Sequence, residues 1–345
     1  MLPIEQLPIP LLEWYRDNAR TLPWREDPTP YHVWVSEIML QQTRVAAVLD
    51  YYARFMAELP DVAALAQVPE GRLMKLWQGL GYYSRARNLQ TAARQIMEEY
   101  GGVFPSQYDQ VRALKGVGDY TAGAICSIAF KQPVPAVDGN VLRVVTRING
   151  DQRDITAQAT KRAIAAQLSP IIPLHAPDKF TQAMMELGAT VCLPNGAPQC
   201  QRCPARDFCV ACAQDSWGRI PVKAPKRPRR IEERTVWLLL HENRVALRQR
   251  APKGLLAGLW EFPNELGTQL PPEWTGDMPR GRFGGVARHI FTHVEWHLTA
   301  QVVRLEEDQL PPGWVWCTWQ ELTDIYAVPN AFSGVMDVVK EEIQG

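Results

Sequence analysis

The sequence lacks any apolar run near the ~20 residues that a membrane-spanning helix needs. Its start, MLPIEQLPIPLLEW, also lacks the basic segment and apolar core of a secretory signal. Net charge is absent too, because 37 basic residues balance 37 acidic residues. The first two absences exclude a membrane-spanning class and predict a cytoplasmic location, beside the nucleoid in a bacterium.

The zero net charge is the sum of two opposite parts. Residues 1–230 carry a net charge of +6 and residues 231–345 carry −6. A neutral total therefore does not exclude a nucleic-acid partner, because attraction to phosphate depends on local charge. A chain of 345 residues is also too long for one ordinary core, so two or more domains are expected.

The two parts also differ in pattern. Residues 7–190 place apolar side chains at intervals of three and four, which predicts mainly helices. Residues 216–234 are basic and proline-rich without apolar periodicity, which predicts an extended linker. We therefore expect an α-helical domain over 1–215, the linker over 216–234 and a second domain over 235–345.

The second domain is predicted to mix strands and helices. Residues 235–241 and 244–249 resemble two strands of a hairpin closed by Glu242 and Asn243. Alternating residues over 289–304 predict further strands, and 333–343 predict a terminal helix. This part is therefore expected to belong to the α+β class.

Five of the seven cysteines lie between Cys192 and Cys212. In a cytosolic chain disulfides are disfavoured, so this crowding indicates a metal site. The spacing Cys192-x7-Cys200-x2-Cys203-x5-Cys209 supplies the four thiolates of a [4Fe–4S] cluster. Spacing alone leaves a structural zinc site as an alternative, and the nearby Cys212 adds a fifth candidate ligand.

Residues 106–130 predict two helices joined by a tight turn. Ser106 precedes Asp109 by three residues, as an N-cap residue does, and Gly116 and Gly118 bracket the turn. Two glycines let backbone N–H groups approach a phosphate closely. Alone, such a turn is most often an ordinary corner between helices.

Two segments together resemble the helix-hairpin-helix base-excision glycosylases, the endonuclease III superfamily. They are LKGVGDYTAGAICSIAF and VPAVDGNVLRVVTR, whose first residues lie about twenty positions apart. Lys115 stands where the family usually has proline. The resemblance implies that Gly116 and Gly118 bind DNA phosphates, and that the four cysteines hold a structural [4Fe–4S] cluster. The family has six residues in the first cysteine gap, and this chain has seven.

Removal of a base requires an acid that protonates the base and an anion that stabilises the sugar cation. Glu37 lies in a predicted apolar helix over residues 34–43, where burial would raise its pKa and keep it protonated. Asp138 precedes a predicted helix and is the candidate anion. Without the resemblance, a surface carboxylate for Glu37 and an N-cap for Asp138 would be the simpler interpretations.

Further motifs resemble the MutY adenine glycosylases within that superfamily, namely TLPWR, SEIMLQQTRV, LWQGLGYYSRARNL and FTQAMMELGA. In that branch the residue matching Glu37 protonates adenine N7. The residue matching Asp138 stabilises the sugar cation, and the residue matching Asn140 orients this machinery. Tyr120 stands where superfamily members that also cut the backbone carry a Schiff-base lysine. Because tyrosine cannot form an imine, we expect a monofunctional glycosylase.

The same resemblance implies residues that read the mismatch. Gln42 and Tyr82 match residues wedged into the duplex beside an oxidised guanine, as base extrusion requires. Five residues match positions that line the adenine pocket: Trp24, Arg25, Leu40, Gln182 and Glu186. Ordinary core packing is the alternative interpretation of Trp24, Leu40 and Tyr82.

Residues 254–263, GLLAGLWEFP, resemble the MutT-related, Nudix-like C-terminal domain of these enzymes. Phe291, Thr292 and His293 match its Phe-Ser-His loop, which senses 8-oxoguanine. Threonine keeps the hydroxyl group that could hydrogen-bond the oxidised base. The R-E-x-x-E-E cluster that holds magnesium in Nudix hydrolases is missing, so we assign this domain to recognition.

The sequence thus predicts a monomeric multidomain enzyme that releases adenine from A:8-oxoguanine or A:G mispairs in double-stranded DNA. It joins an all-α helix-hairpin-helix glycosylase domain with an iron–sulfur loop to a smaller α+β Nudix-like domain. The sequence leaves three alternatives: a Nudix pyrophosphohydrolase, a non-catalytic DNA-binding iron–sulfur protein, and a bifunctional endonuclease III-like glycosylase/lyase. The missing magnesium motif disfavours the pyrophosphohydrolase. The presence of both Glu37 and Asp138 disfavours a non-catalytic protein, and Tyr120 disfavours the glycosylase/lyase.

Overall fold

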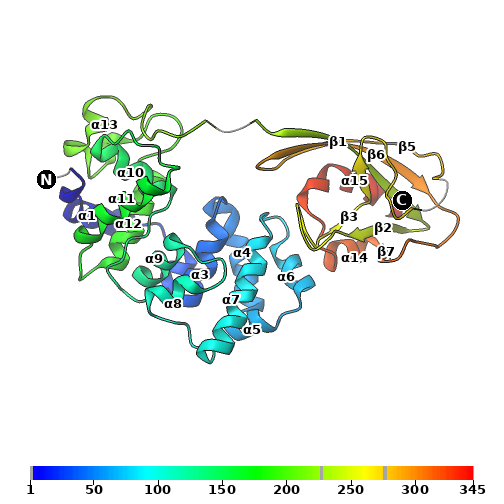
Figure 1. Cartoon of the computed structure of the whole chain (residues 1–345), viewed down its shortest axis with the longest axis horizontal. Coiled ribbons are helices and arrows are strands. Elements are labelled where there is room, and N and C mark those ends of the chain that lie inside the picture. Colours follow the sequence, from blue (N-terminus) through cyan, green and yellow to red (C-terminus); the bar gives the residue numbers. More distant parts are fainter. Residues whose placement is uncertain (1–2, 226–227, 275–277, 345) are drawn as a thin grey trace. The chain divides into compact units, whose positions relative to one another are not determined.

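The computed structural model describes residues 3–225, 228–274 and 278–344. Its contacts divide the chain into two compact units, residues 1–67 with 88–225 and residues 68–87 with 226–345. The first unit is helical, and the second is built around a β-sheet (Figure 1). Within the described residues, no helix is long and apolar enough to cross a membrane.

The helical unit confirms the helical pattern predicted for residues 7–190. Its helices are α1 (Pro8–Asn18), α2 (Pro23–Glu26), α3 (Pro30–Leu40), α4 (Val45–Glu58), α5 (Val62–Gln67), the greater part of α7 (Ser84–Tyr100), α8 (Tyr108–Ala113), α9 (Asp119–Ile128), α10 (Gly139–Asn149), α11 (Gln158–Leu168), α12 (Pro177–Thr190) and α13 (Val210–Ala213). Four 3-10 turns accompany them: η1 (Pro3–Gln6), η2 (Ser169–Ile171), η3 (Cys200–Arg202) and η4 (Arg206–Phe208).

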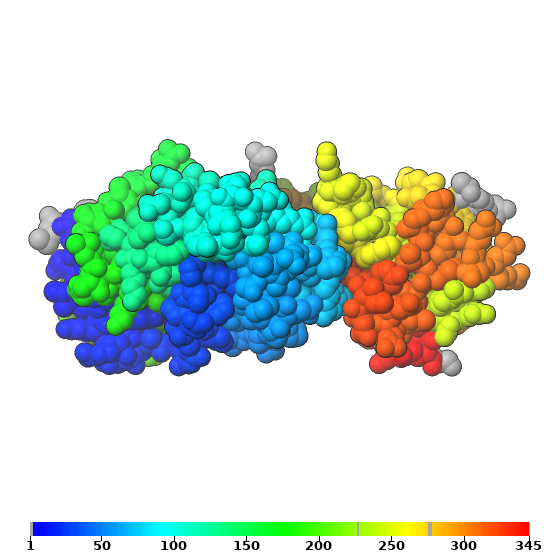
Figure 2. Space-filling model, turned by 90° about the horizontal axis from the view of Figure 1, so that it is seen from below, coloured from blue at the N-terminus to red at the C-terminus, as the bar shows by residue number. Residues whose placement is uncertain are grey.

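The core of this unit joins segments that are far apart in the sequence. Helix α1 packs on α12 (Figure 1), and η1 packs on α10. In the space-filling view, atoms of the blue N-terminal segment lie beside green atoms of later segments (Figure 2). Leu7 and Leu11 are fully buried there against Val144 and Leu187. Burying such aliphatic side chains stabilises a fold by about 1.5–3 kcal/mol each. The chain start is therefore part of the core that positions α10 and α12.

Three helices near the middle of this unit pack closely. Helix α9 contacts both α3 and α12. Every residue from Val33 to Met39 of α3 is buried, which explains why all but Ser36 and Glu37 in this run are apolar. Gly123 of α9 permits a close approach, since a Cβ atom there would lie 2.2 Å from the carbonyl oxygen of Pro135.

The second unit contains a mixed sheet with the strand order β3-β2-β1-β6-β5 in the described residues. Strand β4 pairs with β1, and β7 pairs with β2. Strands β1 and β6 are parallel over their whole length, while β1 and β2 form the predicted hairpin with Leu240 opposite Val245. The elements of this unit are α6 (Glu70–Trp77), β1 (Arg230–His241), β2 (Arg244–Gln249), β3 (Trp260–Glu261), β4 (Asn264–Leu266), β5 (Arg282–Ile290), β6 (Val294–Arg304), β7 (Trp314–Cys317), α14 (Trp319–Asp324), η5 (Asn330–Phe332) and α15 (Ser333–Gln344).

Helix α15, the predicted terminal helix, packs on this sheet. Val335 and Val339 of α15 are fully buried with Phe332 and Trp296 in one core. Segment 68–87 belongs to the same unit and is joined to it by side chain–backbone bonds. Lys75 Nζ donates to the carbonyl oxygens of Leu322 at 3.2 Å and Tyr326 at 3.0 Å.

Several local predictions were wrong in detail. Strand β1 begins at Arg230, inside the segment predicted as linker, because pairing with β6 extends the ladder to Arg230 opposite Val294. Residues 226–227 of that segment lie outside the described residues. Helix α8 has Gln107 as its N-cap residue, without a side-chain capping bond, so Ser106 does not cap it. Helix α3 ends at Leu40 rather than at residue 43.

We expect Gly123→Ala to destabilise the helical unit, because the added Cβ would collide with the backbone at Pro135. Overpacking of this kind costs about 1–3 kcal/mol, which thermal and urea unfolding would detect. Gly71→Ala in α6 is the matched control, since a Cβ there meets nothing within 4 Å. Unfolding of both variants at the wild-type midpoint would contradict the close contact.

Candidate active site

A cavity of about 1430 Å³ opens in the helical unit. It is bordered by α3, α12 and the N-terminal ends of α4, α9, α10 and α11. Most of the residues expected at the catalytic centre line it: Trp24, Arg25, Glu37, Leu40, Gln42, Gly118, Tyr120, Asp138, Asn140, Gln182 and Glu186. The tertiary fold therefore brings together residues from five sequence motifs in one concave site.

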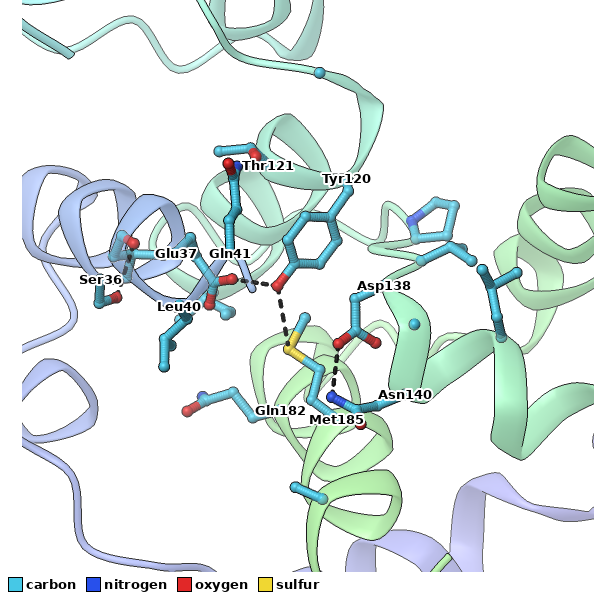
Figure 3. Close-up of a pocket in the computed structure, with 18 of the residues that line it drawn as sticks. Ser36, Glu37, Leu40, Gln41, Tyr120, Thr121, Asp138, Asn140, Gln182 and Met185 are labelled. Carbon is cyan, nitrogen blue, oxygen red and sulfur yellow. Dashed lines mark hydrogen bonds between the residues drawn. The ribbon is translucent and has the colours of Figure 1, made fainter. Parts of the chain in front are cut away.

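Glu37 projects into this cavity from the apolar helix α3 (Figure 3). The residue is only 6% exposed, so it is not a surface carboxylate. Burial raises its pKa to about 7, and the hydrogen bond from the Tyr120 hydroxyl and the nearby Arg25 oppose this rise. Glu37 is therefore half protonated near neutral pH, as a general acid needs to be.

The Tyr120 hydroxyl, from the first turn of α9, donates to Oε2 of Glu37 and lies 3.9 Å from Sδ of Met185 (Figure 3). Burial and the nearby carboxylates of Glu37 and Asp138 raise the pKa of Tyr120 well above its usual value. Tyr120 is thus a neutral donor at every physiological pH. Because it engages Oε2, the other carboxyl oxygen of Glu37 is left to carry a transferable proton.

Asp138 faces the same cavity from the N-terminus of α10 (Figure 3). Its Oδ1 accepts the backbone N–H of Val141 at 2.7 Å, and its Oδ2 accepts the Asn140 side-chain amide at 2.8 Å. Burial raises the pKa of Asp138, and these hydrogen bonds oppose the rise. Asp138 is therefore an N-cap residue and a cavity carboxylate at once, so the two interpretations from the sequence do not compete.

Arg143 extends this chain of contacts and was missed in the sequence analysis. Its guanidinium donates to Oδ1 of Asn140 at 2.9 Å and to the carbonyl oxygens of Gly188 and Cys192, both at 2.7 Å. The side chain is 7% exposed. An arginine three residues after Asn140 on a helix was the available signal, since that spacing places both on one face.

Glu186 forms the centre of a second charged group in the cavity wall. This fully buried carboxylate accepts bonds from Arg20 and from Arg25, the latter at 2.8 Å. Burial alone would raise the pKa of Glu186, but the two guanidinium groups outweigh it and hold the pKa below its usual value. Arg20 is a further residue that sequence reasoning missed, because nothing local predicts a partner on α12.

The turn before α9 has the predicted glycine geometry. Gly116 has a φ of +77°, and a Cβ there would lie 2.6 Å from Cβ of Asn88. Gly118 is the N-cap residue of α9 and lines the cavity, and no side chain caps that helix. The first N–H groups of α9 are thus free of a side-chain cap beside the cavity, where an anion would be favoured.

Four of the predicted recognition residues lie in the second unit, outside the cavity lining. The Tyr82 hydroxyl lies 3.0 Å from Oγ1 of Thr292. Thr292 and His293 are exposed in the turn between β5 and β6. Phe291 instead packs its ring against Trp296, with centroids 4.9 Å apart, so it anchors the turn to the core.

Five cysteines line one small pocket of the helical unit: Cys192, Cys200, Cys203, Cys209 and Cys212. Arg147 donates to Sγ of Cys192 at 3.3 Å, and Sγ of Cys209 lies 3.4 Å from the carbonyl oxygen of Arg147. Burial raises the pKa of Cys203 to about 12 and that of Cys200 to about 11. Across residues 3–225, 228–274 and 278–344, however, no group of three His, Cys, Asp or Glu side chains is arranged to hold a single metal ion. The donor set suits a thiolate-bound group, and five thiols for four positions leave one spare.

We expect the buried carboxyl of Glu37 to titrate near pH 7, because burial disfavours its charged form. Difference infrared spectroscopy would follow its C=O band, which Glu37→Gln removes. Tyr120→Phe is expected to move the midpoint to higher pH, because it deletes a hydrogen bond that favours the anion. A midpoint near 4.5, the value of an ordinary glutamate, would contradict the burial.

Comparison with known proteins agrees with this geometry. Residues 35–170 match the family model described as the HhH-GPD superfamily base excision DNA repair protein, and residues 235–337 match the NUDIX domain. The chain is 37% identical to adenine DNA glycosylase of Mus musculus, over 97% of this chain and 78% of that protein. It is 36% identical to the Homo sapiens enzyme of the same name, over 97% and 74% respectively.

Among solved structures, the chain is similar to endonuclease III in a non-covalent complex with DNA. The TM-score is 0.53 at 25% identity, covering 62% of this chain and 99% of that chain. A thermostable thymine-DNA glycosylase gives a TM-score of 0.55 at 25% identity, over 60% and 94%. Together with the cavity that holds Glu37 and Asp138, these likenesses show that the chain belongs to the MutY-type adenine DNA glycosylases, DNA N-glycosylases of base excision repair with a helix-hairpin-helix domain and a C-terminal Nudix-like domain.

Proposed function

We propose that this glycosylase releases adenine mispaired with 8-oxoguanine, or with guanine, from double-stranded DNA, and that it acts as a monomer without strong lyase activity. The observation that carries the proposal is the pair of carboxyl groups in one cavity. Glu37 has its pKa raised by burial, and Asp138 is among the charges that raise it further. Two acidic groups with different environments are what acid-assisted glycosidic cleavage needs.

The reaction begins when Glu37 gives its proton to adenine N7. The bond between N9 and C1′ then breaks, its electron pair leaves with the base, and neutral adenine departs. Tyr120 keeps the acid oriented through its bond to Oε2 of Glu37. The positive charge left on the sugar is stabilised by Asp138, which Asn140 and the Val141 N–H hold in place. Water adds to C1′, and its proton returns to a carboxylate.

Tyr120 also supports a monofunctional reaction. It occupies the first turn of α9, where an imine-forming lysine would be needed, and its hydroxyl is engaged with Glu37. Lys115 is not among the residues that line the cavity. Borohydride is therefore not expected to trap this chain on DNA.

Two residues with positive φ support the assignment of the mismatch wedge. Gln42, with φ of 60°, lines the cavity just beyond α3, and Tyr82, with φ of 46°, is 46% exposed. L-residues rarely adopt such a conformation, so it persists where the surroundings impose it. In this proposal both side chains enter the stack near the oxidised guanine, and the exposed Thr292 hydroxyl beside Tyr82 bonds that base.

The cavity wall and the glycine turn complete the DNA site. Trp24, Arg25, Leu40, Gln182 and Glu186 surround the extruded adenine. The backbone at Gly116 and Gly118 binds phosphates on the same strand. We assign residues 1–215 to catalysis and residues 235–345 to recognition of 8-oxoguanine, and the predicted linker of 216–234 between them already contains the start of strand β1 at Arg230.

We further propose that Cys192, Cys200, Cys203 and Cys209 hold a [4Fe–4S] cluster, with Cys212 as the spare thiol. When bound, such a cluster cross-links the loop after α12 and performs no step of base release. Arg143 bonds the carbonyl oxygen of Cys192 as well as Asn140, so the order of this loop supports the order of the catalytic centre.

Single-turnover release of adenine from duplexes with adenine opposite 8-oxoguanine, guanine or thymine tests the proposed function. We expect the fastest release opposite 8-oxoguanine and almost none opposite thymine. Glu37→Gln and Asp138→Asn are expected to slow release by roughly 100- to 10 000-fold, the usual contribution of a positioned acid or charge. The rate should fall as the pH rises above about 7, because the acid form of Glu37 is then lost.

Glu98→Gln is the control, because Glu98 is an exposed carboxylate of α7 outside the cavity lining. If Glu37→Gln and Asp138→Asn both release adenine at rates within about tenfold of the wild type, the proposed mechanism is contradicted. A tenfold rate change corresponds to only about 1.4 kcal/mol of activation free energy.

The cluster assignment predicts four iron atoms per chain and a broad visible absorption band. Cys192→Ser is expected to lose iron and to lower thermal stability, because one of four thiolates is removed. Cys212→Ser is expected to keep iron and serves as the matched control within the same pocket. Elemental analysis measures the iron and zinc content per chain, and one zinc ion per chain in place of iron would overturn the assignment.

A further inference from the structure

The loop between α6 and α7 has an unusual backbone. Gly79, Gly81 and Tyr82 have φ values of 105°, 70° and 46°. Glycine adopts positive φ readily, but a tyrosine does so only where other contacts hold it. Because the Tyr82 side chain is nonetheless 46% exposed, the contacts that hold this loop lie mainly on its inner side.

Arg85 supplies contacts of that kind. It lies in the first turn of α7 and is only 8% exposed, so its guanidinium is buried beneath the loop. One guanidinium nitrogen donates to the carbonyl oxygens of Leu80 at 3.0 Å and Gly81 at 3.1 Å. Burial lowers the pKa of Arg85 to about 10, so the group stays charged at neutral pH. A charged donor makes each of these bonds stronger than a neutral one would.

The same guanidinium also contacts two aromatic rings. Its central carbon lies 5.6 Å from the ring centroid of Tyr82 and 5.3 Å from that of Trp77. Trp77 Nε1 donates to the carbonyl oxygen of Gly81 at 3.1 Å. The backbone N–H of Arg85 donates to the carbonyl oxygen of Tyr82 at 2.9 Å. The loop is thus held through three consecutive carbonyl groups, at residues 80, 81 and 82, and through the Tyr82 ring itself.

We propose that Arg85 is a positioning residue for mismatch recognition, which holds the loop of residues 79–82 in the conformation from which Tyr82 enters the DNA stack. This inference rests on the wedge role proposed for Tyr82. Without the buried guanidinium, Tyr82 would leave its left-handed conformation, and DNA binding would have to restore it. A preformed wedge avoids that ordering cost at the moment of recognition.

The geometry explains why arginine is required. A planar guanidinium can bond carbonyl oxygens in its plane while its face contacts an aromatic ring, and a lysine ammonium cannot do both. Arg85→Lys therefore keeps the buried charge and removes the combined contact. This makes it a sharper test than a change to alanine, which would also leave a void.

A double-mutant cycle with Tyr82 tests the proposal. Adenine release opposite 8-oxoguanine is measured in single turnover for the wild type, Arg85→Lys, Tyr82→Ala and the double variant. We expect Arg85→Lys to slow release roughly tenfold in the wild-type background and to change it less than about twofold when Tyr82 is already alanine. A 2-aminopurine placed beside the 8-oxoguanine reports stacking directly, and its fluorescence change on binding should shrink in Arg85→Lys.

The control is Arg94→Lys, since Arg94 lies on the same helix and donates to a backbone carbonyl oxygen, that of Ala66, without contacting the loop. Circular dichroism and thermal melting of each variant set a temperature at which all are folded. If Arg85→Lys does not fold at any temperature, Arg85→Gln enters the cycle in its place.

The outcomes separate this inference from the proposed function. An equal slowing by Arg85→Lys in both backgrounds, or none in the wild-type background, overturns the role of Arg85 while leaving adenine release intact. Wild-type rates for Tyr82→Ala overturn the wedge role of Tyr82, and the Arg85 inference with it. Absence of adenine release from the unsubstituted chain would instead reject the proposed substrate.

Discussion

The burial of one carboxyl group is the constraint on which the catalytic centre depends. Glu37 lies on a helix whose other cavity-lining residues are Val33, Ser36 and Leu40, and its burial raises its pKa to about 7. The cost of placing an acid there is limited by the Tyr120 hydroxyl. The packing of α3 against α9 thus has a chemical consequence, because it keeps about half of this acid protonated near neutral pH.

The opposite side of the cavity is organised by hydrogen bonds rather than by apolar burial. Asp138 caps α10, Asn140 bonds Asp138, and Arg143 bonds Asn140. Arg143 and Arg147 also bond the loop that carries the cysteines, through the carbonyl oxygen and Sγ of Cys192. One short helix therefore connects Asp138, the carboxylate in the cavity, to the pocket that the cysteines line.

In the second unit, aromatic and cationic contacts support two exposed side chains, Tyr82 and Thr292. Phe291 packs against Trp296 and fixes one side of the turn that exposes Thr292. Arg85 fixes the loop that exposes Tyr82, whose hydroxyl meets Thr292. Both exposed side chains are thus supported by buried neighbours, which suits residues that must keep their shape before DNA arrives.

Much of the site could be predicted from the sequence, because short motifs carry their own geometry. The glycine spacing of the hairpin, Asp138 at a helix start and the apolar surroundings of Glu37 all follow from nearby residues. Local pattern was less reliable at the ends of elements. Strand β1 begins earlier than predicted because its partner β6 is distant in sequence, and the capping role expected for Ser106 depends on where α8 begins.

The sequence by itself determined the family and the helical and mixed classes of the two parts, and it predicted the pair of carboxylates, since each depends on residue type and short spacing. Only the tertiary structure decided which distant groups the arginines of the site bond. Arg20 reaches Glu186 across 166 positions and Arg143 reaches the carbonyl oxygen of Cys192 across 49. The physical reason is that a buried charge is satisfied by whichever partner the packing of helices brings within hydrogen-bond distance, and no local periodicity records that choice.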